Sequence, residues 1–295
     1  MATMSEPRTT TSPVISPLIS PLISAEELAT VLSAAAPPVV LDVRWTLAGA
    51  DRDGYLQAHL PGAGFVDLDR ELAAAPGLGG RHPLPEPQAL QQLWRAAGID
   101  DESQVVVYDG GNGLGAARAW WLLRWSGLAS ARVLDGGLAA WAADPARPVE
   151  QGEPAPRRRG AITVATGAMP VVDADEAAAL AAAPGAVLVD ARAAERFRGD
   201  VEPVDPVAGH IPGSVNLPIA SLMTPAGTYL PVGELRSALI AAGVADASRA
   251  AASCGSGVTA CQLVLAGEVA GLALALYPGS YSQWCALGRS VAVGD

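Results

Sequence analysis

The run Ala251-Ala-Ser-Cys-Gly-Ser-Gly-Val-Thr-Ala260 carries the strongest structural signal in this chain. An apolar, strand-like segment ends at Cys254, two glycines follow within three residues, and a helical pattern begins near Thr259. A strand, a tight glycine loop and a helix in this order are typical of an α/β domain. The same order places a thiol beside loop amides and the positive end of a helix, where negative charge on sulfur is stabilised.

The second half of the chain repeats the first. The matching segments, in the same order in both halves, are Val39–Arg44 with Val187–Arg192, Ala58–Ala63 with Gly209–Ser214, Gly98–Ser103 with Gly243–Ser248, Val105–Asp109 with Arg249–Cys254, and Asp135–Trp141 with Pro278–Trp284. Each half alternates helical patterns with short apolar runs that read as buried strands. The sequence therefore predicts two α/β domains, each with a mostly parallel sheet flanked by helices, and Asp109 standing where the other half has Cys254.

Proline spacing and polar composition suggest where the domains begin and end. Proline recurs every fourth residue between Ser12 and Ser24 and prevents a helix there, so we interpret residues 1–22 as a mobile tail or a strand-like lead-in. The first domain is predicted over residues 23–144 and the second over 167–295. A proline-rich stretch with the basic run Arg157-Arg-Arg159 makes residues 145–166 the linker.

Composition excludes several kinds of partner. The formal charge of −11 argues against nucleic acid and against anionic membranes. Prolines, glycines and charges interrupt every apolar stretch, so we expect no membrane span. The three cysteines, at positions 254, 261 and 285, form no even disulfide framework. Free thiols fit a reducing compartment, and we expect a cytoplasmic protein.

These motifs together resemble the tandem rhodanese-domain sulfurtransferases. The resemblance covers about residues 25–290, and its most specific parts are Cys254–Ala260, His210–Gly213, Asp190–Arg192 with Arg196-Phe197, Gly80–Pro85 and Leu134–Gly137. In that family the N-terminal domain has lost the cysteine and the C-terminal domain keeps it. The resemblance thus implies a non-catalytic first domain and a catalytic second domain.

The resemblance also implies the chemistry. The Cys254 thiolate would take the outer sulfur of an anionic donor, 3-mercaptopyruvate or thiosulfate, and hold it as a persulfide. Cyanide, a small thiol or a protein dithiol would then accept that sulfur. No cofactor and no metal is expected. The residues implied to bind the donor and the persulfide are Arg196, Gly255, Gly257, Val258 and Thr259.

The residue at position 205 leaves the identity of the sulfur donor undecided. The Gly-Ser-Gly-Val-Thr loop is similar to the mercaptopyruvate branch, because the thiosulfate branch carries a basic pair after the cysteine. The mercaptopyruvate branch, however, has a second arginine nine residues beyond the position of Arg196. Asp205 stands there in this chain, and a carboxylate is expected to repel an anionic donor.

A proton relay is also implied by the resemblance. In the mercaptopyruvate branch, the histidine of the N-terminal His-Leu/Ile-Pro-Gly motif faces the catalytic loop. His59 would fill that role here, with Ser256 of the loop and an aspartate for which Asp51 is the candidate. His210 has the same motif in the second domain, and we expect it to be structural.

Other chemistries fit less well. A cysteine phosphatase needs an arginine six residues after the cysteine, and that position is Ala260. Cys254 and Cys261 lack the spacing of paired zinc ligands. The alternative that remains is a non-catalytic rhodanese-like module that binds, carries sulfur or regulates. Reactivity of Cys254 separates that module from an enzyme.

Overall fold

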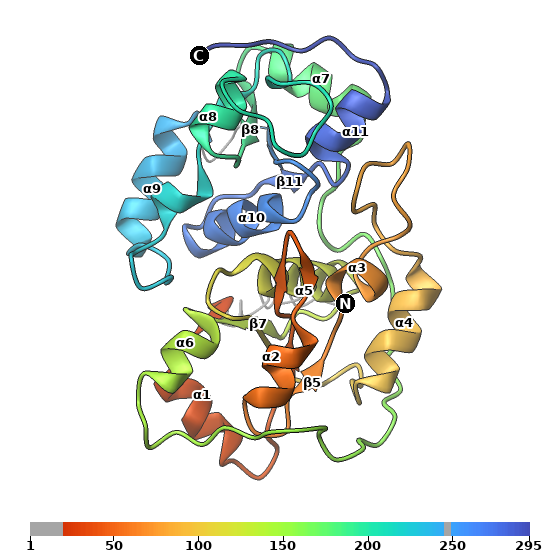
Figure 1. Cartoon of the computed structure of the whole chain (residues 1–295), viewed down its shortest axis with the longest axis vertical. Coiled ribbons are helices and arrows are strands. Elements are labelled where there is room, and N and C mark those ends of the chain that lie inside the picture. The colour runs from red at the N-terminus through yellow and green to blue at the C-terminus, as the bar shows by residue number, and fades with distance from the viewer. Residues whose placement is uncertain (1–19, 245–248) are drawn as a thin grey trace, which may run out of the picture.

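The chain folds into two α/β units that lie one above the other in Figure 1. The computed structural model describes residues 20–244 and 249–295. The predicted tail falls mostly on residues 1–19, which lie outside the described residues. Its described end is ordered, because Leu22 and Ile23 form a strand paired with Val133 and Leu134. The predicted bounds of the domains and of the linker stay predictions.

The first unit is built on a parallel sheet of five strands. Its strands are β1 (Leu22–Ile23), β2 (Val39–Asp42), β5 (Gly64–Phe65), β6 (Val105–Tyr108) and β7 (Ala131–Leu134), in the order β1-β7-β6-β2-β5. A small antiparallel hairpin, β3 (Trp45–Thr46) with β4 (Gly49–Ala50), stands beside it. The helices are α1 (Ala25–Leu32), α2 (Arg52–Gln57), α3 (Leu68–Glu71), α4 (Pro87–Ala96), α5 (Leu114–Trp125) and α6 (Gly137–Ala142).

The second unit repeats this plan with a parallel sheet of four strands. Its strands are β8 (Ala186–Asp190), β9 (Val215–Asn216), β10 (Arg249–Ser253) and β11 (Ala275–Leu276), in the order β11-β10-β8-β9. Its helices are α7 (Ala174–Ala182), α8 (Ala194–Arg198), the 3₁₀ turn η1 (Ile219–Leu222), α9 (Val232–Ala241), α10 (Thr259–Val269) and α11 (Ser280–Ala286). The prediction of two α/β domains with parallel sheets flanked by helices is confirmed.

The central strands explain the parallel arrangement. Every residue of β6 is buried, and β10 is buried from Ala250 to Ser253. Strands covered on both faces read as continuous apolar runs, and parallel crossovers supply that cover. The carboxyl ends of β10 and β8 therefore open on the same edge of the sheet, where functional loops of such folds lie.

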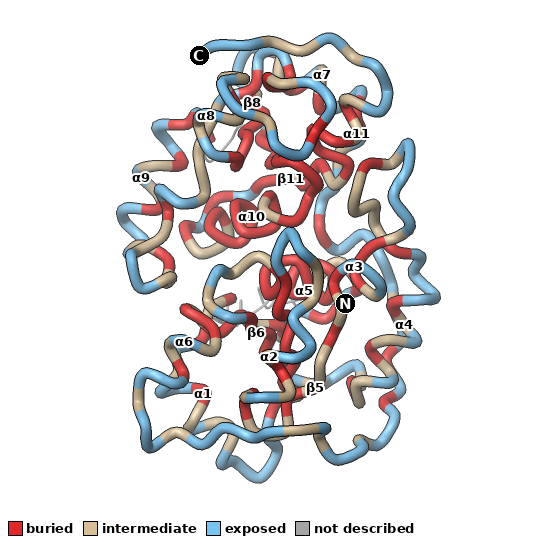
Figure 2. The backbone as a smooth tube through the Cα atoms, viewed as in Figure 1, coloured by how far each residue is buried: buried red, intermediate tan, exposed pale blue. Residues whose placement is uncertain are grey.

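The two units share one hydrophobic core at their interface. Helices α5 and α10 pack face to face across it, and both are largely buried in Figure 2. Neither helix has a polar face: residues 115–123 of α5 and 260–267 of α10 are all buried. The Trp120–Trp121 pair belongs to this shared core, together with residues of α10 such as Leu265. A helix that is buried all round needs cover on all sides, so the interface completes both units.

Candidate active site

Cys254 lies directly after β10, at the first position of the glycine loop. Cys254 is only 2% exposed, and the backbone N–H of Gly257 donates a hydrogen bond to its Sγ at a distance of 3.1 Å. Helix α10 begins five residues later, so its positive end lies behind the loop. Gly257 has φ +80°, and a Cβ there would lie 2.2 Å from the carbonyl oxygen of Pro278. Only glycine fits that position without strain.

The start of α11 holds the loop from the other side. The Ser280 hydroxyl accepts from the N–H of Cys254 at 3.1 Å, and the Cys254 carbonyl accepts from the N–H of Tyr281 at 3.0 Å. The Gly255 carbonyl accepts from the N–H of Ser282 at 2.8 Å. The thiol is therefore held by a rigid backbone frame rather than by a mobile loop.

The thiol opens on a cavity of about 700 Å³ between the two units. The first unit contributes Trp45, Leu47, Arg81 and Leu114, and the second contributes Ala191–Arg196, Pro218–Ser221, Cys254–Ser256, Val258 and Thr259. The predicted loop residues Gly255, Ser256, Val258 and Thr259 therefore line the cavity beside Cys254. A site at a domain interface is a common place for a small-molecule pocket.

A serine, a histidine and an aspartate form a connected row beside the thiol. Ser256 Oγ lies 2.7 Å from His82 Nδ1, and His82 Nε2 lies 3.1 Å from Asp69 Oδ1. Trp45 Nε1 donates to the other carboxylate oxygen of Asp69 at 2.9 Å. The ring of His82 meets the ring of Trp45 edge-on. Trp45, Asp69 and His82 of the first unit are thereby fixed against the glycine loop of the second.

Burial keeps the His82 ring neutral near neutral pH. Desolvation lowers the pKa of His82 below its usual value, and the positive charge of Arg118 adds to the effect, while the hydrogen bond to Asp69 opposes it. A neutral ring with its proton on Nε2 donates to Asp69 and leaves Nδ1 to accept from the Ser256 hydroxyl. Arg118 also fixes the backbone there, since its Nη2 donates to the His82 carbonyl at 3.0 Å.

The expected role of His59 is wrong. Its ring is completely buried inside the first unit, where it stacks on Tyr55 with ring centroids 4.3 Å apart. Its Nδ1 lies 2.9 Å from the Tyr55 carbonyl oxygen, and its Nε2 faces Glu150. Asp51 caps the helix α2 through the N–H of Gly54, so it takes no part in a relay either. His82 and Asp69 occupy the places expected for His59 and Asp51.

The repeat held a signal that would have found His82. The chain has three histidines, and two of them, His59 and His210, are counterparts in the two halves. His210 also stacks on an aromatic ring, that of Phe197, and its Nδ1 lies 2.8 Å from the Phe197 carbonyl oxygen. The same local structure in both halves indicates a scaffold role for this pair. His82 is the histidine with no counterpart, and it is the one that contacts the glycine loop through Ser256.

Asp205 does not face the site as a free negative charge. Its side chain is 1% exposed and pairs with two guanidinium groups, those of Arg81 and of Arg196, the latter at 3.3 Å. The repulsion expected of Asp205 is therefore wrong, because its charge is neutralised by these pairs. Arg196 Nη2 also donates to Glu202 at 2.6 Å, and Arg196 lines the cavity as expected.

A third arginine, Arg192, pairs with other acids of this cluster. Arg192 pairs with Asp190 at 2.8 Å and with Glu202 at 3.4 Å, and its guanidinium lies 4.0 Å from the ring centre of Tyr281. Burial alone would raise the pKa of Glu202, but the hydrogen bond from Arg196 and bonds from backbone amides bring it below its usual value. Glu202 can thus stay ionised at neutral pH.

The other two thiols, those of Cys261 and Cys285, do not line the cavity beside Cys254. Burial raises the pKa of Cys261 to about 12, and its Sγ lies 3.2 Å from the Gly257 carbonyl oxygen. Burial also raises the pKa of Cys285. Both thiols therefore stay protonated, and the unreactive thiol expected at Cys261 agrees with this environment.

The counterpart loop of the first unit is filled by its own side chain. Asp109 accepts hydrogen bonds from the N–H groups of Gly111, Gly113 and Ala116 at 2.9, 3.0 and 3.2 Å. Burial raises the pKa of Asp109, and these three amides oppose that shift. The carboxyl group takes the amides that a bound anion or a persulfide would need, so this loop offers no second site.

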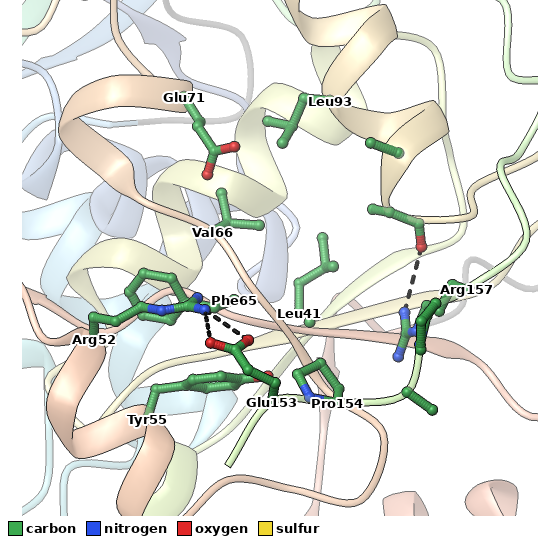
Figure 3. A pocket seen from close by; sticks show the side chains of 15 residues that line it. Leu41, Arg52, Tyr55, Phe65, Val66, Glu71, Leu93, Glu153, Pro154 and Arg157 are labelled. Atoms are coloured by element: carbon green, nitrogen blue, oxygen red, sulfur yellow. Dashed lines mark hydrogen bonds and ion pairs between the residues drawn. The ribbon is translucent and has the colours of Figure 1, made fainter.

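Figure 3 shows a second cavity, beside strand β5. Its volume is about 300 Å³, and it shares no lining residue with the cavity beside Cys254. Residues 153–157 cross the sheet edge there, held by an ion pair of Arg52 with Glu153 and by the guanidinium of Arg157, which donates to backbone carbonyls. Of the cavity's other charged groups, Glu71 accepts from the backbone N–H of Asp67. The contacts of residues 153–157 attach the segment between the units to the first unit, and they place no nucleophile in the cavity.

Two negative findings concern the described residues alone. In the ranges 20–244 and 249–295, no three His, Cys, Asp or Glu side chains come close enough to hold a metal ion. Over the same ranges no helix is long and apolar enough to cross a membrane.

Comparisons with known proteins agree on one family. The family model described as "Rhodanese-like domain" matches residues 24–144 and again 173–287. The Mycobacterium tuberculosis protein named "Putative thiosulfate sulfurtransferase SseB" is 45% identical over 268 residues, which is 88% of this chain and 92% of that protein. The 3-mercaptopyruvate sulfurtransferase of Escherichia coli K12 is 33% identical over 252 residues, covering 83% of this chain and 88% of that protein.

Solved structures give the same result. The crystal structure of SseA from Escherichia coli, described as a 3-mercaptopyruvate sulfotransferase, superimposes with a TM-score of 0.75 at 30% identity and covers 90% of this chain and 100% of that chain. The 3-mercaptopyruvate sulfurtransferase from Leishmania major gives a TM-score of 0.77 at 32% identity, covering 90% of this chain and 74% of that chain.

Proposed function

Because the chain belongs to the tandem rhodanese-domain sulfurtransferase family, we propose that it moves a sulfane sulfur from a small anionic donor, through a persulfide on Cys254, to a nucleophilic acceptor. One observation carries the proposal. The Cys254 thiol has a backbone amide at 3.1 Å, opens on a cavity with an arginine-rich wall, and adjoins the row Ser256–His82–Asp69.

In the first step the Cys254 thiolate attacks the sulfur of the donor. A sulfur–sulfur bond forms, and the bond between sulfur and the rest of the donor breaks and leaves its electron pair on the leaving group. The Gly257 amide and the start of α10 stabilise the negative charge that stays on the persulfide. Sulfur supplies the reactivity itself, so we propose a reaction without metal or cofactor.

The relay favours 3-mercaptopyruvate as the donor. Its leaving group is the enolate of pyruvate, which must take up a proton, while its thiol must give one up. Ser256 and His82 can move that proton, because the neutral His82 ring accepts from Ser256. Thiosulfate leaves as sulfite and needs no proton. We therefore assign Ser256 and His82 to the reaction of 3-mercaptopyruvate and keep thiosulfate as the second donor.

In the second step an acceptor attacks the outer sulfur of the persulfide. Cyanide leaves as thiocyanate, a thiol leaves as its own persulfide, and a protein dithiol becomes a disulfide and releases sulfide. Each attack returns the Cys254 thiolate. Residues of both units line the cavity beside Cys254, and its volume of about 700 Å³ supports access for a small acceptor. We propose the cytoplasm as the place of action, since the three cysteines are all free thiols.

The alternative function, a non-catalytic rhodanese-like module, would be expected to have a blocked or altered loop. The first unit has such a loop at Asp109, whereas the second keeps its thiol facing a cavity. The difference between the two halves of one chain supports an enzyme with a single site.

The mass of the intact protein tests this function. After incubation with 3-mercaptopyruvate or thiosulfate and removal of small molecules, the wild type should gain one sulfur atom and lose it again with cyanide. The variant Cys254→Ser should gain none, while Cys285→Ser, which removes a thiol outside the loop, should behave as the wild type. Failure of the wild type to gain sulfur from either donor would refute the proposal.

A further inference from the structure

Arg81 belongs to the first unit, but its guanidinium lies over the catalytic loop of the second. A Cβ built at Gly255 would lie 2.9 Å from Arg81 Nη2 and 3.7 Å from Arg196 Nη1. Two guanidinium nitrogens from different units therefore lie within 4 Å of one point beside Cys254. Within the described parts of the chain, neither nitrogen donates to a protein acceptor. Both are available to a ligand in the cavity.

The backbone of Arg81 is tied to the catalytic loop. Its N–H donates to Ser282 Oγ at 3.1 Å, and the N–H of the same serine donates to the Gly255 carbonyl at 2.8 Å. Gly80, with φ +99°, lets the chain approach closely, because a Cβ there would lie 2.8 Å from the Gly279 carbonyl oxygen. This placement of Arg81 therefore follows from the contact between the units rather than from chance on an exposed loop.

Asp205 fixes the side chains of both arginines. Its buried carboxylate accepts from Arg81 Nη1 and from Arg196 Nη2, the latter at 3.3 Å. Each guanidinium thus spends one terminal nitrogen on Asp205 and keeps the other beside Gly255. A planar guanidinium held at one end presents its remaining donors in a fixed direction, which suits a carboxylate.

We propose that Arg81 and Arg196 together bind the carboxylate of the sulfur donor, and that Asp205 is a positioning residue that holds Arg81 for this task. The inference rests on the proposed transfer through Cys254 and adds to it the origin of the second donor-binding cation. The first unit then supplies a binding group as well as His82. The absence of a side chain at Gly255 leaves room for both guanidinium groups.

The charge balance of the cluster indicates which donors it takes. The described charged groups that interlock here are three cations and three anions, namely Arg81, Arg192, Arg196, Asp190, Glu202 and Asp205. A neutral cluster with two free N–H donors suits a small monocarboxylate. A dianion such as thiosulfate would find hydrogen bonds but no net positive charge. The site should therefore prefer 2-oxo acid donors over inorganic dianions.

The first test measures the rate of Cys254 persulfide formation in a single turnover at increasing concentrations of 3-mercaptopyruvate. Its readout is the concentration that gives half of the maximal rate. The variant Arg81→Ala should raise that concentration about 10- to 100-fold, because charge-assisted hydrogen bonds are lost. Its rate at saturation should change far less. Arg81→Lys should restore part of the loss. Arg198→Ala is the matched control, since Arg198 lies two residues from Arg196 but pairs with Asp200 on the outside.

The second test uses the sign of the effect at Asp205. If Asp205 only repelled the donor, Asp205→Asn would strengthen donor binding. If Asp205 positions Arg81, Asp205→Asn should weaken donor binding several-fold in the otherwise unchanged protein. The same change in the Arg81→Ala background should weaken donor binding less, because only the contact of Asp205 with Arg196 is then lost. Equal effects in the two backgrounds would remove the positioning role.

Equilibrium binding of pyruvate separates this inference from the proposed function. Pyruvate has the carboxylate but no sulfur to transfer, so its affinity reports the two arginines even if no persulfide forms. We expect Arg81→Ala to weaken pyruvate binding about tenfold or more, and Arg198→Ala to leave it unchanged. Pyruvate and 3-mercaptopyruvate affinities within twofold of the wild type in a folded Arg81→Ala variant would overturn the inference.

Discussion

At the scale of single residues, the contrast between two histidines decides how the site is understood. His59 and His82 both belong to the first unit, but only His82 contacts the glycine loop after β10, through Ser256 Oγ at 2.7 Å. His59 packs on Tyr55 in the interior. The difference is one of local backbone: His59 follows a short helix inside the unit, whereas His82 lies on the loop that meets the start of α11.

Exchanging each histidine should give opposite outcomes. His82→Ala should lower kcat for 3-mercaptopyruvate about 100-fold or more, the usual size of a lost acid–base group, and change thermal stability little. His59→Ala should lower the melting temperature, because it leaves a cavity and removes a buried hydrogen bond to the Tyr55 carbonyl. It should leave kcat of the folded protein near normal. Steady-state kinetics and thermal melting of both variants check this. Equal kcat values would contradict the relay.

The pH dependence should depend on the donor. His82 has a pKa lowered by burial below the ordinary histidine value of about 6.5, so its ring is neutral at neutral pH and accepts a proton. As pH falls through that lowered pKa, the ring is protonated and the rate with 3-mercaptopyruvate should fall. The rate with thiosulfate should stay flatter over the same range, because no proton is required.

The variant Asp69→Asn should move the pH at which the rate with 3-mercaptopyruvate falls, that is, the acidic limb of the pH–rate profile. The hydrogen bond and charge of Asp69 raise the pKa of His82, so their loss should displace the limb to lower pH. A displacement to higher pH, or an unchanged limb, would show that another group titrates. Rate profiles of wild type and variant at saturating 3-mercaptopyruvate provide the measurement.

At the scale of elements, the strand–loop–helix segment from β10 to α10 does most of the positioning. The loop is closed by Gly257 at φ +80°, held by Ser280 at the start of α11, and ended by α10. The equivalent segment from β6 to α5 has the same form, but Asp109 occupies its amides. One loop geometry thus produces an open site in one unit and a filled one in the other.

Gly257→Ala should damage both stability and activity. Its Cβ would meet the Pro278 carbonyl oxygen at 2.2 Å, and the positive φ alone costs about 1–3 kcal/mol for a residue with a side chain. The amide that donates to Cys254 would move with the loop, so persulfide formation should slow as well. The matched control is Gly233→Ala in α9, where a Cβ meets nothing within 4 Å and stability should change by less than about 1 kcal/mol. Urea unfolding of both variants decides.

At the scale of the whole molecule, the interface makes the two units one structure. Helices α5 and α10 share a core, and the relay and the arginine pair both join the units. The site exists only where the units meet. A rigid interface of this kind explains how a residue of the first unit can be placed within hydrogen-bond distance of a loop in the second.

The shared core should make unfolding cooperative. We expect a single thermal transition for both units in calorimetry. Trp121→Ala should lower the stability of that one transition by about 3–5 kcal/mol, because the side chain is fully buried in the shared core. Val232→Ala, at an exposed position, should have little effect. Two separate transitions in the wild type would contradict the account of the interface.

Sequence reasoning reached the fold and the thiol, and it failed where contacts cross the interface. Period and repeat predicted two parallel α/β units, and the glycine loop pointed to Cys254, because these signals are local. The prediction of the relay histidine was wrong because His82 and Ser256 lie 174 positions apart in the sequence and come together only through packing of the two units. The sequence alone predicts a free charge at Asp205, because its partner Arg81 lies in the other unit.

The stoichiometry of the first half-reaction tests the central claim most directly. With 3-mercaptopyruvate in excess and no acceptor, a rapid-quench experiment should release one pyruvate for each active chain, with one sulfur on the peptide that contains Cys254. Addition of cyanide should discharge that sulfur as thiocyanate. Release of pyruvate with no sulfur on Cys254, or with the sulfur on Cys261 or Cys285, would contradict the account.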